Sequence, residues 1–333
     1  MESLDLRVLG DALAWHSGGH AVTLVTVVQT WGSAPRPPGA LLAVRDDGLV
    51  SGSVSGGCVE DDLITRTKES FSTHGKGREL PKPSLIVYGV SKEEASRFGL
   101  PCGGTLRLVQ EPLRESSWIE QLLARTAAHQ LVARCLTLAT GEVRLLDAAR
   151  GQPIRFDGAT LTTVFGPKWR LLLIGAGQLS QAVAQMAVML DFEVLLCDPR
   201  EEYAATLGVG LQGMRRVHGM PDDVVRELAP DAHTAVVALT HDPKLDDMAL
   251  LEALQSGAFY VGALGSRRNQ EARKKRLAEH FGLSASDLAR LHGPVGLALG
   301  ARTPAEIAVS VVAELVQVKN TVASVVAGTG RTA

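Results

Sequence analysis

A glycine turn between two apolar runs is the feature that most constrains how this chain can fold. Residues 171–174 are all apolar and lead into a Gly-Ala-Gly turn that begins at Gly175. An amphipathic stretch follows, and a second apolar run at 194–197 ends on Asp198. This order predicts a strand, a tight turn, a helix and a second strand, which together form the first half of a Rossmann dinucleotide-binding unit.

Each part of this turn has a physical role in binding a dinucleotide. Gly175 allows the sharp turn, and Gly177 lets the backbone approach a pyrophosphate because it carries no Cβ atom. The N–H groups that open the helix would face that anion, and Asp198 lies near the spacing expected of an acid that accepts from a ribose hydroxyl. Ser180 replaces the third glycine of the motif and is small enough to pack against the strand. The pattern predicts the fold, whereas dinucleotide binding needs further support, since this fold serves many functions.

Length and charge set the class of protein. A chain of 333 residues is long enough for two domains with separate cores. The formal net charge is −2, so no basic excess indicates nucleic acid. Charged residues or glycines interrupt every apolar run before about 18 residues, which argues against a membrane-spanning helix. The chain begins with acidic residues and has no basic-then-apolar signal segment, so we expect a cytoplasmic protein.

Beyond Arg200, strands and helices continue to alternate, which predicts a doubly wound parallel sheet over residues 169–323. An apolar run at 234–239 ends in a polar triplet that contains His241. Ligands of open α/β sheets lie beyond the carboxyl ends of the strands, so His241 is a candidate site residue. The alternative is a structural cap.

A second anion site is predicted where a strand at 259–264 leads into Gly265, Ser266, Arg267 and a basic helix. A helix N-terminus next to arginines favours a bound anion. The alternative is the solvated basic face of an ordinary surface helix.

The remaining organisation follows from composition. Residues 1–150 mix helical and strand-like stretches and predict an α+β domain. Residues 151–168 contain scattered Gly, Pro, Thr and Asp and are predicted to be a linker, and the small residues at 324–333 predict a flexible tail. The fold class is therefore α/β, with an N-terminal α+β domain followed by a Rossmann-like domain.

The four cysteines fall into two groups. None forms a C-x-x-C pair, which argues against a zinc ribbon or a redox motif. Cys135 and Cys197 lie in apolar, strand-like runs and are expected in the core. Cys58 and Cys102 lie beside glycines in loops, and Cys102 precedes Gly103 and a strand, which suits a ligand or a reactive thiol better than core packing.

The loop before Cys58 has the pattern of an anion nest. Exposed N–H groups at Gly56 and Gly57 would bind an anion. Cys58 would open a helix and have a lowered thiol pKa, and Glu60 would complement the helix dipole in the first turn. The alternative is a glycine turn, a capped helix and a buried cysteine.

Seven blocks of the sequence, in order, resemble the XdhC/CoxI family, which contains accessory proteins for molybdenum hydroxylases such as xanthine dehydrogenase. The resemblance covers nearly the whole chain, and its SGGCVE and PCGG blocks are much more specific than the Gly-x-Gly turn. The blocks are GSAPRPPGALLAV (32–44), GSVSGGCVEDDL (52–63), GLPCGGTLRLVQEP (99–112), LLIGAGQLSQAVA (172–184), THDPKLD (240–246), YVGALGSRR (260–268) and GPVGLALGARTPAEIAVSVVAELV (293–316).

This resemblance implies a chaperone rather than a stand-alone enzyme. Members of the family are thought to bind the molybdenum cofactor, protect it, support its sulfuration by a cysteine desulfurase and hand it to an apo-hydroxylase. The cofactor would be molybdopterin or its cytosine dinucleotide form, and both remain open. A homodimer is expected, with no nucleic-acid or membrane partner.

The resemblance also implies the site. The glycine-flanked cysteines of the family fall on Cys58 and Cys102, which are expected near one cofactor cleft at the junction of the domains. Molybdenum and its dithiolene are soft enough to suit a thiolate, so these thiols are the expected metal contacts; ligation, sulfur transfer and a disulfide all remain open. The other expected cofactor-binding residues are Gly56, Gly57, Gly103, Gly175, Gly177, Asp198, Arg200, His241, Ser266 and Arg267.

Two positions depart from the family pattern, because many members carry His where Gln178 stands and Gly where Ser180 stands. Both changes weaken the case for an ordinary nicotinamide dinucleotide. An NAD(P)-dependent oxidoreductase with His241 as acid/base is nevertheless one alternative, and Arg200 leaves NAD and NADP undecided. A protein-interaction scaffold is another. The two loop thiols favour the chaperone, since neither alternative has an obvious use for them.

Overall fold

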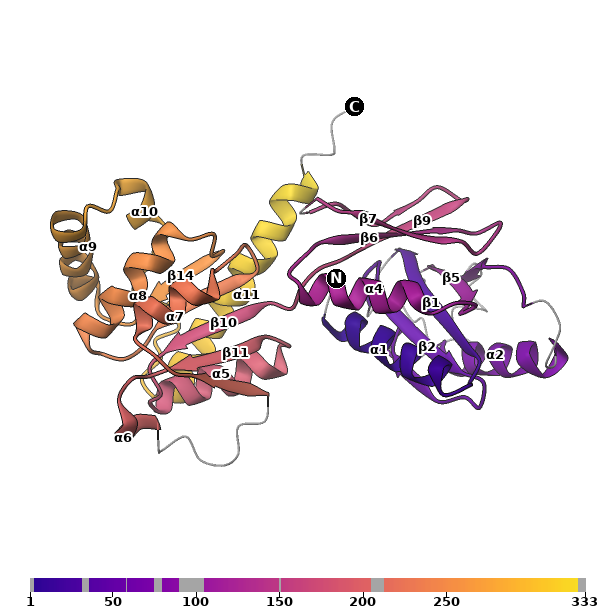
Figure 1. The fold of residues 1–333 in the computed structure, drawn as a ribbon, viewed down its shortest axis with the longest axis horizontal. Helices are drawn as coiled ribbons and strands as arrows, with labels where there is room; N and C mark the ends of the chain where they lie inside the picture. The colour runs from indigo at the N-terminus through magenta and orange to yellow at the C-terminus, as the bar shows by residue number, and fades with distance from the viewer. Residues whose placement is uncertain are drawn as a thin grey trace. The chain divides into compact units, whose positions relative to one another are not determined.

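The structure, a computed structural model, describes residues 3–31, 36–57, 59–74, 80–89, 105–149, 151–204 and 213–328. The chain divides into two compact units, Met1–Pro167 and Lys168–Ala333 (Figure 1). Each unit has its own sheets and its own core.

The first unit contains two antiparallel sheets. One has the strand order β3-β2-β1-β5-β4, and the other has the order β7-β6-β9-β8. The elements, in chain order, are α1 (Ser3–Ser17), β1 (Val22–Thr30), β2 (Leu41–Arg45), β3 (Val50–Gly52), α2 (Glu60–His74), β4 (Ser84–Tyr88), β5 (Leu106–Pro112), α4 (Ser117–Ala127), β6 (Val132–Thr137), β7 (Val143–Asp147), β8 (Arg155–Phe156) and β9 (Thr160–Phe165).

Strand β1 is the centre of this unit because both of its faces are buried. Leu24 packs in one cluster with Leu9 of α1 and Ile119 of α4. Its neighbour Val25 points to the other face and packs in a cluster with Leu63 of α2. The run of β-branched residues in β1 fits this environment, since such side chains favour a pleated, buried surface.

Residues 151–168 are not the linker that the sequence predicts. Strands β8 and β9 occupy most of this stretch, and β9 pairs with β6 along its whole length. Leu161 and Phe165 of β9 are buried, so the strand contributes to the core of the first unit. The boundary between the units falls after Pro167.

The second unit is built on a six-stranded sheet with the order β12-β11-β10-β13-β14-β15, and every pair is parallel. The elements are β10 (Arg170–Ile174), α5 (Gln178–Met189), β11 (Glu193–Cys197), α6 (Glu201–Ala204), β12 (Met214–Val217), α7 (Pro221–Leu228), β13 (Thr234–Ala238), α8 (Pro243–Gln255), β14 (Tyr260–Ala263), α9 (Arg267–Phe281), α10 (Ala285–Ala289), β15 (Leu291–His292) and α11 (Pro304–Gly328).

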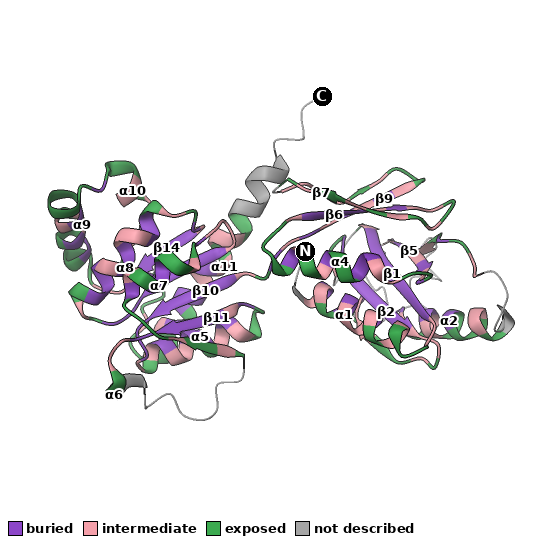
Figure 2. Cartoon of the chain, viewed as in Figure 1, coloured by how far each residue is buried: buried purple, intermediate pink, exposed green. Residues whose placement is uncertain are grey.

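Helices cover both faces of this sheet, and its central strands are buried throughout (Figure 2). Leu171 and Leu173 of β10 point into the cluster formed with α5 and α11. Leu172 and Ile174 point into the cluster formed with α7, α8 and α9. This two-sided burial confirms the predicted doubly wound fold and the α/β class, although α10 and β15 are not anticipated by the sequence.

Helix α11 begins with a reciprocal cap between Thr303 and Glu306. The Thr303 hydroxyl accepts from N of Glu306 at 3.3 Å, and the Glu306 carboxylate accepts from N of Thr303 at 3.0 Å. The helix extends to Gly328, so it includes the first half of the predicted tail at 324–333, and the remaining residues lie outside the described part. Within the described ranges, no helix is long and apolar enough to cross a membrane.

Candidate functional site

The candidate site of the second unit lies at the carboxyl edge of its parallel sheet. The chain passes from β10 outward to β11 and β12, then returns to the other side of β10 with β13 and continues to β14 and β15. The order in which strands are added to the sheet therefore reverses between β10 and β13, although the strands stay parallel. Open α/β sheets bind ligands at this kind of position. Four loops that carry predicted site residues leave this edge, after β10, β11, β13 and β14.

The two glycines of the β10–α5 turn have different roles. Gly175 has φ of +109°, and a Cβ atom there would lie 3.1 Å from N and 3.2 Å from Cα of Thr240. Two properties therefore require glycine at position 175: the sharp turn, and the close approach of the Thr240 backbone. Gly177 has an ordinary φ of −71°, and among the described residues nothing beyond its chain neighbours lies within 4 Å of the position of its absent Cβ. The fold does not require this second glycine, so the open space in front of it is available to a ligand.

Helix α5 opens directly beside that space. Its first backbone hydrogen bond runs from N of Gln181 to O of Gly177, at 3.1 Å. The N–H groups before Gln181 therefore point out of the helix and suit an anion. Gln178 is exposed at this end, whereas Ser180 is 1% exposed and packs against the sheet. Ser180 fits the place of the third glycine, although its hydroxyl has no hydrogen-bond partner among the described residues.

Asp198 does not present a free carboxylate at this edge. Its Oδ1 accepts from N and Nε of Arg200 at 3.1 and 2.9 Å, and its Oδ2 accepts from Nη2 of Arg200 at 2.8 Å and from N of Ala176 at 2.9 Å. Burial raises the pKa of Asp198, but these hydrogen bonds outweigh it and hold the pKa below its ordinary value. The sequence predicts that Asp198 accepts from a ribose hydroxyl; in the structure its acceptors are taken by Arg200 and by the glycine turn.

His241 lies at the end of β13, next to the residue that contacts Gly175. It is exposed and has φ of +63°, which is uncommon for a residue other than glycine. The preceding residue, Thr240, is held rigidly: its hydroxyl donates to Asp246 Oδ1 at 2.7 Å, and its N donates to the same oxygen at 3.2 Å. His241 is therefore an exposed imidazole on a fixed backbone at the point where the strand order reverses.

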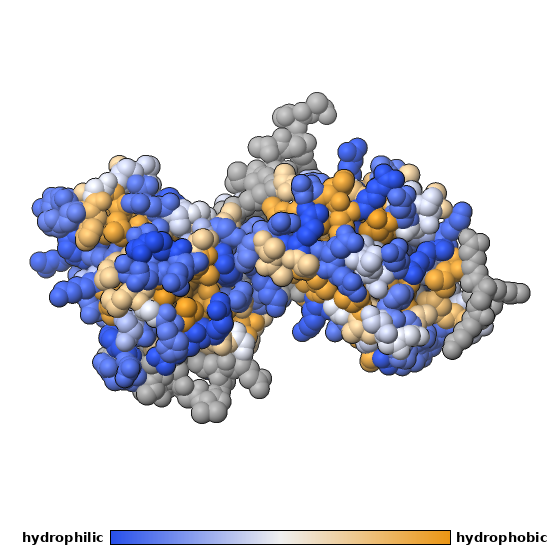
Figure 3. All heavy atoms as spheres, in the orientation of Figure 1, coloured by the Kyte–Doolittle hydropathy of each residue, from blue (hydrophilic) through white to orange (hydrophobic). Residues whose placement is uncertain are grey.

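The loop after β14 places a second helix N-terminus at the same edge. The Ser266 hydroxyl caps α9 by accepting from N of Asn269 at 3.2 Å, and Arg267 is exposed in the first turn. In the structure the Ser266 hydroxyl therefore serves as a helix cap, whereas the sequence predicts it as part of an anion site. Figure 3 shows hydrophilic side chains over α9, as its exposed arginines and lysines require.

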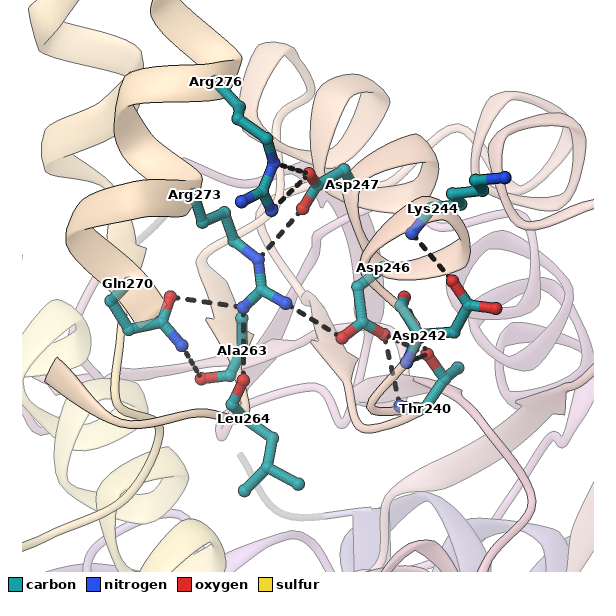
Figure 4. A network of polar contacts seen from close by, with 10 residues as sticks. All are labelled: Thr240, Asp242, Lys244, Asp246, Asp247, Ala263, Leu264, Gln270, Arg273 and Arg276. Carbon is teal, nitrogen blue, oxygen red and sulfur yellow. Dashed lines mark hydrogen bonds and ion pairs between the residues drawn. The ribbon is translucent and has the colours of Figure 1, made fainter. Parts of the chain in front are cut away.

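A buried ionic network fixes the loops after β13 and β14 (Figure 4). Asp246 of α8 accepts from Thr240 and pairs with Nη2 of Arg273 at 3.0 Å. Arg273 also donates to Asp247 Oδ1 at 3.0 Å, to Oε1 of Gln270 at 3.2 Å and to O of Leu264 at 3.2 Å. Burial raises the pKa of Asp246, against the opposing effects of Thr240 and Arg273. The network joins α8 to α9 and so holds both loops of the candidate site.

Sequence reasoning missed the centre of this network. Gln270, Arg273 and Leu277 are all buried on α9, at intervals of three and four residues. Arg276 joins them by donating to Asp247 Oδ2 from Nε and Nη2. This spacing was a signal of an inward face, but the high charge of the helix favoured a solvated interpretation.

In the first unit, Glu60 fills the anion nest that the sequence predicts at the Gly56–Gly57 turn. Its carboxylate accepts from N of Val54, Ser55, Gly57 and Val59 at 3.0–3.2 Å and from the hydroxyls of Ser53 and Ser55. N of Gly56 donates to Ser53 Oγ at 2.9 Å. The N–H groups expected to face a ligand anion are therefore already paired within the chain.

The environment of Glu60 makes it a strong internal anion. Burial raises its pKa, but the hydrogen bonds from Ser55, Ser53 and the loop backbone lower it to about 2. Gly56 and Gly57 have φ of +78° and +114°, which only glycine adopts readily. The two glycines shape the loop around the Glu60 carboxylate.

The predicted thiol site lies outside the described residues, as Cys58, Cys102 and Gly103 all do. Of the two cysteines expected in the core, Cys197 is buried and Cys135 is only half-buried, with Sγ 3.5 Å from Thr162 Oγ1. Among the residues that the structure describes, no cluster of three or more His, Cys, Asp or Glu side chains could hold a metal ion.

Comparison with known proteins identifies the family. The family model described as the XdhC Rossmann domain matches residues 171–315, and that of the XdhC and CoxI family matches residues 15–80. A Bacillus subtilis protein, named as a probable subunit of xanthine dehydrogenase, is 30% identical over 329 residues, spanning 91% of this chain and 94% of that protein. This chain belongs to the XdhC and CoxI family. The resemblance seen in the sequence is thereby confirmed.

One further relative and one solved structure are similar to this chain over nearly its whole length. The molybdenum cofactor insertion chaperone PaoD of Escherichia coli is 29% identical over 316 residues, covering 94% of this chain and 87% of PaoD. A solved structure described as a xanthine dehydrogenase from Bacillus halodurans has a TM-score of 0.75 at 24% identity and covers 96% of both chains. The fold is therefore shared along nearly the whole chain.

Proposed function

We propose that this protein is a molybdenum cofactor chaperone that protects the cofactor, supports its sulfuration and delivers it to a xanthine dehydrogenase-type hydroxylase. The observation that carries the proposal is the similarity to a molybdenum cofactor insertion chaperone over 94% of this chain. Its partners would be the apo-hydroxylase and a cysteine desulfurase, and it would act in the cytoplasm as a homodimer.

The carboxyl edge of the Rossmann unit suits the anionic end of a molybdopterin. Gly177 leaves open space in front of the first N–H groups of α5, which is the usual arrangement for a phosphate. Arg267 supplies an exposed cation at the start of α9, and His241 an exposed imidazole after β13. When bound, the cofactor would bring the molybdenum centre, and these residues would hold and orient its phosphate-bearing end.

The soft end of the cofactor is assigned to Cys58 and Cys102, because molybdenum and a dithiolene suit thiolate contacts. The loop that leads to Cys58 is anchored by Glu60, whose carboxylate accepts from N of Gly57 and of Val59. Gly56 and Gly57 serve this assignment through backbone conformation rather than through free N–H groups, and Gly103 remains a predicted member of the site.

Cofactor retention tests the proposal directly. Protein purified from a host that makes molybdopterin should yield a fluorescent pterin after oxidation with acid and iodine. Cys102→Ala and Cys58→Ala should each reduce the amount of pterin per chain several-fold. Cys135→Ala is the matched control, since this half-buried thiol lies on β6 beside Thr162, and it should retain the wild-type amount.

Two outcomes would count against the proposal. Absence of pterin, under conditions in which PaoD retains it, would remove the chaperone assignment. Equal losses in all three cysteine variants would remove the argument for the loop thiols but leave the assignment of the family unchanged. Static light scattering of the purified chain tests the homodimer separately.

A further inference from the structure

We propose that Arg200 is a specificity-determining residue that prevents the Rossmann unit from recognising a ribose diol. In the structure its guanidinium donates to both oxygens of Asp198, the acid that stands where a Rossmann unit accepts from a ribose hydroxyl. The carboxyl edge would thus bind an anionic group through the α5 N-terminus without selecting a ribose. Arg200 would have this role whichever form of the pterin the chain carries.

The hydrogen bonds of Asp198 divide into two kinds. Two come from the backbone: N of Ala176 donates to Oδ2 at 2.9 Å, and N of Arg200 donates to Oδ1 at 3.1 Å. The other two come from the Arg200 side chain, Nε to Oδ1 at 2.9 Å and Nη2 to Oδ2 at 2.8 Å. A carboxylate has about four lone-pair positions, so this set leaves Asp198 without capacity for another donor.

The two side-chain bonds occupy one acceptor position on each oxygen of Asp198. A ribose presents two neighbouring hydroxyls, and a Rossmann acid accepts from the ribose on the same side of the glycine turn. The guanidinium fork places one donor on each oxygen of Asp198, with the added strength of a charged donor. A neutral diol therefore has to displace a stronger, already positioned partner.

The surroundings keep this pair in place. The Asp198 side chain is 1% exposed, whereas that of Arg200 is 24% exposed. Pro199 between them has a fixed φ, and the i to i+2 bond from N of Arg200 closes a tight turn over the carboxylate. The guanidinium therefore covers Asp198 from the solvent side.

Removal of the Arg200 side chain should convert this edge into a dinucleotide site. Arg200→Ala frees one acceptor on each oxygen of Asp198 and leaves both backbone bonds intact. We expect wild-type protein to bind NAD+ with Kd above about 1 mM, and Arg200→Ala to bind it at least tenfold more tightly in isothermal titration calorimetry. NADP+ should gain nothing, because its 2′-phosphate replaces one hydroxyl and is repelled by the exposed carboxylate.

Three companion proteins make the test decisive. Adding Asp198→Asn to Arg200→Ala should abolish the gain. Arg216→Ala removes an exposed arginine from β12 and should behave as wild type. Arg200→Lys keeps a cation but cannot donate to both oxygens at once, so its gain in affinity for NAD+ should be smaller. If circular dichroism shows that Arg200→Ala does not fold, Arg200→Lys is used in its place.

The proposal is overturned if wild-type protein binds NAD+ in the micromolar range, or if folded Arg200→Ala and Arg200→Lys both bind NAD+ no better than wild type. An equal gain for NAD+ and NADP+ would also overturn it, since that pattern indicates added space at this edge rather than a freed diol acceptor. Pterin retention, measured on the same preparations, reports on the proposed function separately.

Discussion

The Oδ2 atom of Asp246 lies 3.0 Å from Nη2 of Arg273, and neither side chain is more than 7% exposed. The pair joins the first turn of α8 to the middle of α9 across 27 residues of chain. Both charges are buried, so each is stable inside the protein only because the other neutralises it. A buried charge without its partner lowers the free energy of unfolding far more than a buried pair does.

Arg273→Leu should therefore lower the free energy of unfolding by about 3–5 kcal/mol, because Asp246 loses its cation inside the protein. Urea titration followed by circular dichroism measures the loss. Arg268→Leu, at an exposed position of the same helix, should change stability by less than about 0.5 kcal/mol. Combining Arg273→Leu with Asp246→Asn should recover part of the loss; strict additivity would show that the two residues do not depend on each other.

The two glycines of the β10–α5 turn should respond differently to alanine. Gly175→Ala places a Cβ atom against the Thr240 backbone in a left-handed conformation, and we expect a loss of about 2 kcal/mol or more in unfolding free energy. Gly177→Ala should cost less than about 1 kcal/mol, but should reduce pterin retention, since the new methyl occupies the space before α5. Thermal unfolding and pterin content on the same samples separate the effects. Equal destabilisation would contradict the packing explanation.

Glu60 should make the stability of the first unit depend on acid pH. Its pKa is about 2 in the folded chain and near its ordinary value of 4.5 when unfolded. The Glu60 contribution is therefore complete above about pH 5 and is lost as the pH falls toward 2. With allowance for partial exposure, Glu60→Gln should cost on the order of 1–2 kcal/mol at pH 7 and almost nothing near pH 2.

Chemical denaturation at pH 7, 5 and 3 follows this difference. Asp61→Asn, at an exposed position of the same helix turn, is the control and should cost less than about 1 kcal/mol. A Glu60→Gln deficit that stays constant down to pH 3 would show that the loop does not depend on the ionised carboxylate.

Cys197 should be chemically inert in the folded protein. Burial, and to a lesser degree the charge of Asp198, raises the pKa of its thiol to about 12, so almost no thiolate exists at pH 8. Iodoacetamide should modify it only after unfolding, as measured by mass spectrometry of the peptides. Half-buried Cys135 should react faster; rapid labelling of Cys197 in native protein would contradict its placement in the core.

The sequence predicted the Rossmann unit because its signals are local. Buried strands such as β10 must be apolar on both faces, and the sharp turn at Gly175 admits only glycine. The same reasoning located the edge of the sheet at which Gly177, His241 and Arg267 lie. It failed at residues 151–168, where glycines and prolines hid the alternation of Leu161 and Phe165 in β9.

The sequence could not predict which polar groups satisfy one another. Asp198 follows the glycine turn at the distance of a ribose acceptor, but its role depends on the rotamer of Arg200 two residues later. Glu60 has the position of a helix-dipole acid, yet it turns back onto the preceding loop. Arg273 finds Asp246 only once α8 and α9 have packed. Pairings of this kind are set by tertiary geometry and have no periodic signature.

The Glu60 carboxylate that holds the Ser53–Gly57 turn also bears on how a carrier would exchange its cargo. A loop whose N–H groups bind an anion of the ligand becomes ordered when the ligand binds and disordered again when it leaves. Each transfer of the ligand then carries the free-energy cost of ordering the loop. Here Glu60 supplies the anion permanently. In the proposed chaperone, this part of the receiving surface would have the same shape before and after handover, so both capture and release could proceed without local folding or unfolding.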